Sequence, residues 1–112
     1  MKSKILALSK NEDFKSLLKQ NKISNKYVTI FYGQLNKNLN KFNISFVTKK
    51  KIGNAVKRNK IKRRLKNIAD DAVKKLSLKF NYSYLVIAKP TMLNNEYTII
   101  KETLFKDLER IH

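Results

Sequence analysis

The residues best suited to chemistry in this sequence are basic, and they concentrate between Lys49 and Asn67. This segment reads KKKIGNAVKRNKIKRRLKN and holds ten Lys or Arg residues but no Asp or Glu. Exposed helices usually mix charges of both signs, so the run is more typical of a surface that binds a polyanion than of an ordinary solvated face. The chain as a whole carries a formal net charge of +18 on 112 residues. A charge of this size opposes folding by self-repulsion, which a bound nucleic acid would relieve.

Residues that could catalyse a reaction are scarce by comparison. Nuclease chemistry needs metal-binding carboxylates or a histidine acid–base pair, and the chain has eight Asp or Glu residues, one His and no Cys. Asp70 and Asp71 are adjacent, but neighbours on a helix point about 100° apart and do not form one site. His112 is the last residue. We therefore expect no catalytic residue, no metal site and no small-molecule substrate.

Three segments are predicted to be strands. Residues 26–33 and 82–89 are rich in β-branched and aromatic residues, and Pro90 ends the second of them. In residues 41–48 the apolar Phe42, Ile44 and Phe46 alternate with other residues. Segments 26–33 and 41–48 are expected to be neighbouring antiparallel strands.

Three helices are predicted around these strands. The first begins at Ser9, whose spacing from Glu12 is that of a capping box, and fades near Gln20. The second runs from about Val56 and buries one stripe, made by Ile61, Leu65, Ile68, Ala72 and Leu76. The third is capped by Asn94 or Asn95 and buries Tyr97, Ile100, Leu104, Leu108 and Ile111. The order α-β-β-α-β-α predicts a single α+β domain, residues 1–112, with helices packed on a mostly antiparallel sheet.

The second helix positions the basic residues. With Ile61 and Leu65 facing the core, Arg58 and Lys62 flank the stripe, and five polar residues point away from it: Asn59, Lys60, Arg63, Lys66 and Asn67. The cations would meet phosphates, and the Asn59 amide suits a 2′-hydroxyl or a base edge. Before the helix, Gly53 predicts a positive φ or a close backbone approach, and the helix N-terminus also favours phosphate.

The order G-N-A-V-K-R-N-K-I-K-R-R resembles a known signature, that of the protein subunit of bacterial ribonuclease P. That signature is close to K-K-x-G-N-A-V-x-R-N-x-x-K-R. Here it is matched by Lys50, Lys51, Gly53, Asn54, Ala55, Val56, Arg58, Asn59, Lys62 and Arg63. Residues 8–18 resemble the first helix of that family and residues 84–90 its last strand, so the resemblance covers nearly the whole chain.

The resemblance implies an RNA-binding subunit of an endoribonuclease. In this family a catalytic RNA, with Mg²⁺ that it mainly binds itself, cleaves precursor tRNA to give the mature 5′ end, and the protein supports this at low magnesium. The family fold is α-β-β-β-α-β-α with a left-handed βαβ crossover. By carry-over, the residues that contact the ribonuclease P RNA are Lys50, Lys51, Asn54, Arg58, Asn59, Lys62, Arg63 and Lys66.

The resemblance also implies a cleft between the first helix and the sheet that holds the single-stranded 5′ leader of precursor tRNA. Its expected lining is Phe14, Leu18, Tyr27 and Phe31. Aromatic faces stack on any base, so leaders of many sequences would be tolerated. Leu18 stands where the family often has a second aromatic, and Phe14 can equally be a core residue of an amphipathic helix.

Three alternatives were weighed against this interpretation. A structural RNA-binding protein, such as a ribosomal protein or an RNA chaperone, explains charge and size but not the ordered motif. A DNA-binding regulator would need a helix-turn-helix pair, whereas strands flank the basic helix. A peripheral membrane role is least favoured, because the long helix buries its apolar stripe against the sheet and leaves only charge outside. The apolar run near the N-terminus has only four residues, and nothing approaches the roughly 18 of a membrane span. The protein is expected to be cytoplasmic.

Overall fold

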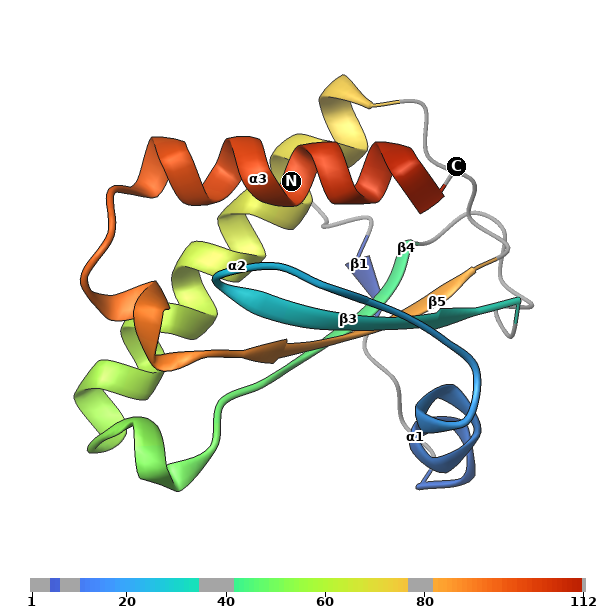
Figure 1. Cartoon of the computed structure of the whole chain (residues 1–112), viewed down its shortest axis with the longest axis horizontal. Coiled ribbons are helices and arrows are strands. Elements are labelled where there is room, and N and C mark those ends of the chain that lie inside the picture. Colours follow the sequence, from blue (N-terminus) through green and yellow to red (C-terminus); the bar gives the residue numbers. More distant parts are fainter. Residues whose placement is uncertain (1–4, 7–10, 35–41, 77–81, 112) are drawn as a thin grey trace.

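A mixed sheet with the strand order β1-β4-β5-β3-β2 forms the centre of the protein (Figure 1). The computed structural model describes residues 5–6, 11–34, 42–76 and 82–111. Within these residues the strands are β1 (Ile5–Leu6), β2 (Asn21–Ser24), β3 (Val28–Gly33), β4 (Phe42–Val47) and β5 (Ser83–Ala88).

The strand β5 lies between β3 and β4, so the prediction that those two strands are neighbours is wrong. β5 pairs antiparallel with β3 and parallel with β4. All of its residues except Ile87 are buried, and a strand buried on both faces belongs in the middle of a sheet. The pairing of β1 with β4 is parallel and that of β2 with β3 antiparallel. The sheet is therefore mixed rather than mostly antiparallel.

The strand β2 was not expected from the hydrophobic pattern, because it contains a single apolar residue, Ile23. It forms a hairpin with β3 through a turn at Asn25. The Oδ1 atom of Asn25 accepts hydrogen bonds from the backbone N–H groups of Tyr27 (2.7 Å) and Val28 (2.9 Å). Its Nδ2 atom donates to Oδ2 of the buried Asp107 at 2.6 Å, which ties the hairpin to the last helix. With β2, three strands lie between the first helix and the second, as the family resemblance implied.

The helices cover the two faces of the sheet unequally. The helices α2 (Ala55–Lys75) and α3 (Tyr97–Ile111) lie on one face, and the short α1 (Asn11–Leu18) lies on the other (Figure 1). Two 3-10 turns, η1 (Lys50–Ile52) and η2 (Pro90–Leu93), precede α2 and α3. These bounds agree with the predicted helices, and β4, α2 and β5 form a parallel crossover. The left-handed sense of that crossover stays a prediction.

The helix bounds agree with the predictions, but the residues predicted to cap α1 and α3 are not confirmed as caps. Ser9, predicted to cap the first helix, lies outside the described residues. Asn94 instead ends η2, and the Nδ2 atom of Asn95 donates to the Thr91 carbonyl at 2.7 Å. Both asparagines therefore serve η2 rather than α3.

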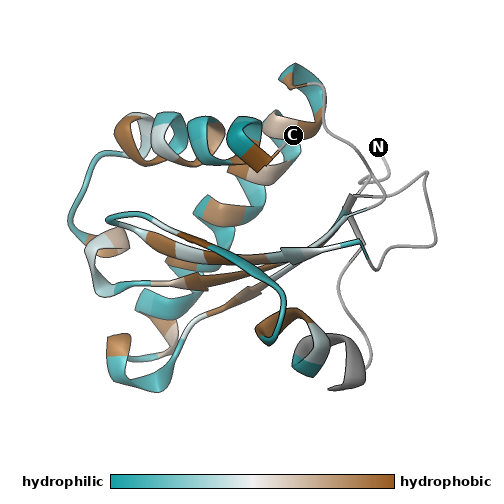
Figure 2. Ribbon diagram, turned by 45° about the vertical axis from the view of Figure 1, so that its right-hand side comes forward, coloured by the Kyte–Doolittle hydropathy of each residue, from teal (hydrophilic) through white to brown (hydrophobic). Residues whose placement is uncertain are grey.

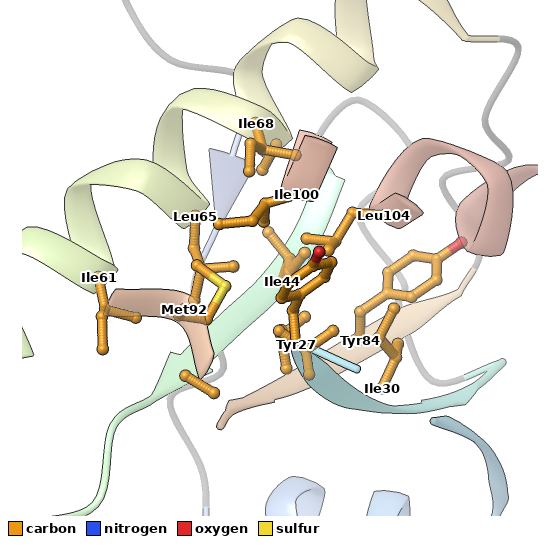
Figure 3. Packing of buried hydrophobic residues seen from close by; sticks show 14 of the residues in the cluster. Tyr27, Ile30, Ile44, Ile61, Leu65, Ile68, Tyr84, Met92, Ile100 and Leu104 are labelled. Carbon is orange, nitrogen blue, oxygen red and sulfur yellow. The ribbon is translucent and has the colours of Figure 1, made fainter. Parts of the chain in front are cut away.

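The main core fills the space between the sheet and the pair α2–α3 (Figure 3). The predicted helix stripes supply Ile61, Leu65, Ile68, Ala72, Ile100, Leu104 and Leu108, all buried. The last residues predicted for the stripes, Leu76 and Ile111, pack against this core while half-buried, as Tyr97 does. Because the stripe of α2 faces inward, its opposite side is left to solvent.

Polar contacts fix how α2 is rotated against its neighbours. The Nη1 atom of Arg64 donates to the carbonyl oxygens of Met92 and Asn95, both at 3.1 Å. Further along, Nζ of Lys101 on α3 lies 2.5 Å from Oδ2 of Asp71 on α2. This hydrogen bond lowers the pKa of Asp71 and raises that of Lys101. Because its guanidinium is held by the carbonyls of Met92 and Asn95, Arg64 is a structural cation in the middle of the basic segment.

We expect Arg64→Met to lower the free energy of unfolding by roughly 1.5–3 kcal/mol, because two part-buried carbonyls lose a charged donor. The methionine keeps most of the apolar stem, so the melting temperature, Tm, reports mainly the lost hydrogen bonds. It should fall by about 10 °C. Lys60→Met is the matched control, since Lys60 is exposed on the same helix. Equal Tm values for the two variants would contradict a structural role for Arg64.

Candidate nucleic-acid interface

The turn between β4 and α2 presents the first lysines of the basic segment. Ile52 is buried and anchors η1, while Lys50 and Lys51, which precede it in the turn, are exposed. Gly53 has φ 154° and ψ −165°, a conformation that L side chains rarely adopt. The predicted positive φ is confirmed. This turn sets the direction in which α2 leaves the sheet.

Asn54 is the N-cap of α2. Its Oδ1 atom accepts a hydrogen bond from the backbone N–H of Lys57 at 3.0 Å, which satisfies one of the donors that a helix start leaves unpaired. Asn54 was predicted to contact RNA but not to cap the helix, although an Asn directly before the helical pattern is a known start signal. Its exposed position leaves the amide NH₂ accessible beside the lysines.

The outer side of α2 gathers four of the eight predicted RNA-binding residues. Asn59, Lys62, Arg63 and Lys66 are all exposed, and we call this set the basic face. Figure 2 shows hydrophilic residues along α2, in contrast to the apolar strands beneath it. Arg58 is half-buried at the border, and its Nε atom has no hydrogen-bond partner among the described residues. Arg58 is therefore directed less toward solvent than Arg63.

A hollow of about 480 Å³ opens on this side of α2, lined by Val56, Asn59, Lys62 and Arg63. Val56 is 74% exposed. The hollow thus combines an apolar wall, an amide and two cations. Asn59 and Arg63 were predicted on the outer side and Lys62 at the border of the buried stripe, whereas no role was predicted for Val56.

A second, apolar surface lies on the sheet face under α1. Leu17 of α1 is fully buried against Leu85 of β5, and Phe31, Val47 and Ile87 pack around this pair while half-buried. We call these five residues the α1 face. The strand register aligns Phe31 with Leu85 and Ser45 in one row across β3, β5 and β4. α1 packs mainly on β2, β3 and β5, so the row runs from under the helix toward β4.

Only some of the residues predicted for a leader cleft meet on this face. Phe31 belongs to it, and Leu18 is 50% exposed on the helix that borders it. Tyr27 does not: it is 4% exposed in the main core, on the opposite side of the sheet. The predicted placement of Tyr27 is thus wrong, because several aromatics near β3 made the register ambiguous. The side chain of Phe14 lies outside the described residues.

The α1 face also contains four residues that were not predicted to belong to a site: Leu17, Val47, Leu85 and Ile87. The alternation in β5 gave a signal, because Leu85 and Ile87 must point to the side opposite Tyr84 and Val86.

Nearby, the paired residues Asn43 and Ser83 each have a buried side-chain oxygen that lacks a hydrogen-bond partner among the described residues. Buried polar atoms of this kind need an explanation, such as a ligand or an ordered water.

This fold and its two surfaces define a small α+β protein with a basic helix face, the class that binds RNA. The family model described as Ribonuclease P matches residues 3–112. The chain is 36% identical over 102 residues to the ribonuclease P protein component of Carboxydothermus hydrogenoformans, which covers 87% of this chain and 83% of that protein. It is also 36% identical over 98 residues to the same component of Mesoplasma florum, with 87% and 86% covered. The chain belongs to the family of bacterial ribonuclease P protein components.

Solved structures of ribonuclease P proteins share the fold of this chain. The ribonuclease P protein of Thermotoga maritima superposes with a TM-score of 0.78 at 20% identity, covering 96% of this chain and 98% of that one. A Staphylococcus aureus ribonuclease P protein gives 0.73 at 27% identity, covering 94% and 93%. Membership of the family makes the chain part of an endoribonuclease complex with an RNA partner. In the described part of the chain, no helix has the length and apolar character needed to cross a membrane.

Proposed function

We propose that this chain is the accessory subunit of ribonuclease P that binds the catalytic RNA through the basic face and the 5′ leader of precursor tRNA through the α1 face. In this role it supports 5′ maturation of tRNA at low magnesium in the cytoplasm. The observation that carries the proposal is the exposed row of Asn59, Lys62, Arg63 and Lys66 on a helix whose other side is fixed in the core.

The contribution of the basic face is electrostatic. Folded RNA crowds phosphates together, and lysines and arginines that approach them release condensed counterions. Lys50 and Lys51 extend the positive surface beyond the helix start, and the segment 49–67 holds no acid that would oppose them. A protein that neutralises phosphates in this way would replace part of the magnesium requirement of the RNA and would therefore support cleavage at low magnesium.

The chemistry of cleavage is assigned to the RNA and to the magnesium that it holds. Among the described residues, no three His, Cys, Asp or Glu side chains gather into a group that could bind a metal ion.

The α1 face has properties suited to a single-stranded leader. Phe31 offers an aromatic side chain that can stack on any base, and Leu18 extends the apolar border. Two small polar residues lie beside them: Ser45 in the same row of the sheet as Phe31, and Thr29 in the adjoining row. An apolar centre beside small polar groups would hold nucleotides with little preference for sequence.

The test is cleavage of a precursor tRNA that carries its 5′ leader, at low magnesium, with protein alone, with a bacterial ribonuclease P RNA alone, and with both. Activity in the mixture only, giving the mature 5′ end, is the expected result. Phe31→Ala should weaken the mixture's preference for leader-bearing over leaderless substrate, whereas Ile99→Ala, an exposed apolar control on α3, should not. Cleavage by the protein alone would overturn the assignment of catalysis to RNA. Tight RNA binding without enhancement would favour a structural RNA-binding protein.

A further inference from the structure

We propose that the hollow beside Val56 receives one unpaired nucleobase of the RNA partner, so that the basic face reads a single-stranded position as well as the backbone. The inference rests on the proposed RNA-binding function of the same face. It assigns a binding role to Val56, whose side chain the fold does not use.

Val56 is the most exposed of the large apolar side chains among the described residues. Its exposure is 74%, against 50% for Leu18 and 47% for Ile99. A valine at such a position adds nothing to the core, and as a β-branched residue it favours a helix less than lysine or alanine does. It lies within a segment of ten cations, where a side chain that serves solubility alone would be polar. The Val56 side chain is therefore available to contact a binding partner.

The lining of the hollow matches the parts of a nucleotide. Val56 and Asn59 are three residues apart and so lie on the same side of α2. The apolar side chain of Val56 suits the flat face of a base, and the Asn59 amide can both donate to and accept from a base edge. Lys62 and Arg63 line the same hollow and would meet the phosphates on either side. Because all four lining residues come from one exposed side of α2, the hollow is open to solvent and would cover one face of a base rather than enclose it.

An unpaired base fits this chemistry better than a duplex does. An A-form RNA helix presents phosphates, 2′-hydroxyls and base edges, while the flat faces of its bases are covered by stacking. Such a surface offers nothing apolar for Val56 to cover. A base in a bulge, loop or joining strand has an exposed face, and its burial removes apolar area of both partners from water.

The first experiment compares Val56→Ala with Arg63→Ala for binding to a bacterial ribonuclease P RNA over a range of salt concentrations. Val56→Ala should weaken binding about five- to fifteenfold through lost apolar contact while the salt slope stays at the wild-type value. Arg63→Ala should reduce the slope by about 0.7–0.9. Ile99→Ala is the control for loss of an exposed apolar side chain away from the hollow and should bind as wild type. Since Val56 is exposed and alanine favours a helix more than valine does, the Tm of the variant should not fall, which checks that it folds.

A second experiment locates the contact. A photoreactive benzophenone group on Val56→Cys should crosslink to unpaired nucleotides of the ribonuclease P RNA, and the same group on Ile99→Cys should crosslink weakly. Wild-type affinity of Val56→Ala, or crosslinks from position 56 confined to duplex segments, would overturn the nucleobase site while leaving the proposed function intact. Failure of the wild-type protein to bind the RNA at all would remove both.

Discussion

Leu65→Ala is expected to lower the free energy of unfolding by about 2–5 kcal/mol, the usual cost of a cavity in a packed core. Leu65 is 1% exposed and lies where α2 meets the sheet and α3 (Figure 3). Small domains have only about 5–15 kcal/mol of stability in total. The variant should therefore melt at least 10 °C below the wild type in a thermal unfolding experiment.

The matched control is Leu18→Ala, because the same atoms are removed from a side chain that is 50% exposed. We expect it to cost less than about 1 kcal/mol. A Leu65→Ala variant as stable as Leu18→Ala would mean that α2 is not seated on the sheet as described. The basic face would then have no fixed orientation, since Leu65 belongs to the stripe that holds α2 in place.

The helices and the basic face could be predicted from the sequence because their signals are local. Ile61, Leu65 and Ile68 recur at helical spacing over several turns, and this periodicity fixes which residues of α2 face outward. The same wheel that buries these three exposes Asn59 and Arg63, as found. The positive φ of Gly53 was predictable for a similar reason, since one residue type marks the turn.

Strand order could not be predicted, because pairing joins residues far apart in the chain. β5 follows β4 after the whole of α2, yet it lies between β3 and β4. Its nearly continuous burial was visible as a run of apolar residues, but that run does not say which strands are its neighbours. The same limit applies to Tyr27, whose face depends on the register of a strand rather than on its own type.

Residue type also failed to separate two adjacent arginines. Arg63 is exposed on the basic face, while Arg64 turns toward η2 and donates to two carbonyls. The distinction follows from a rotation of 100° about the helix, which brings one guanidinium beside a backbone that lies about 30 residues further along the chain. Charge in this segment therefore has two uses: one cation holds α2 in position, and its neighbours present charge to the partner.

The two proposed surfaces lie on opposite sides of the sheet. The α1 face looks away from α2, and the basic face is the outer side of α2 itself (Figure 1). They are connected by β4, η1 and the turn at Gly53, since Val47 ends β4 on the α1 face and α2 begins a few residues later. This arrangement allows one small domain to hold a leader on one side and the catalytic RNA on the other.

The double variant Lys62→Ala/Arg63→Ala is expected to weaken binding to ribonuclease P RNA roughly 25- to 60-fold at 0.1 M salt. Each lost phosphate contact lowers the slope of log affinity against log salt by about 0.7–0.9. The loss of two contacts thus lowers the slope by about 1.4–1.8. Over the tenfold change from a 1 M reference to 0.1 M salt, this difference in slope corresponds to the roughly 25- to 60-fold loss of affinity. Both side chains are exposed, so the Tm should change little, and binding measured at several salt concentrations gives the slope directly.

The control removes the same two charges elsewhere, by Lys106→Ala/Arg110→Ala on the exposed side of α3. If affinity depends only on net charge, the two double variants will lose affinity and slope equally, and the basic face will have no special role. If the basic face contacts the RNA, the α3 variant will keep nearly the wild-type slope. The charges removed from α3 would then lie more than a Debye length from the RNA phosphates, where salt screens their interaction. The difference in slope between the two variants, rather than the loss of affinity alone, therefore decides whether α2 is the RNA-binding helix.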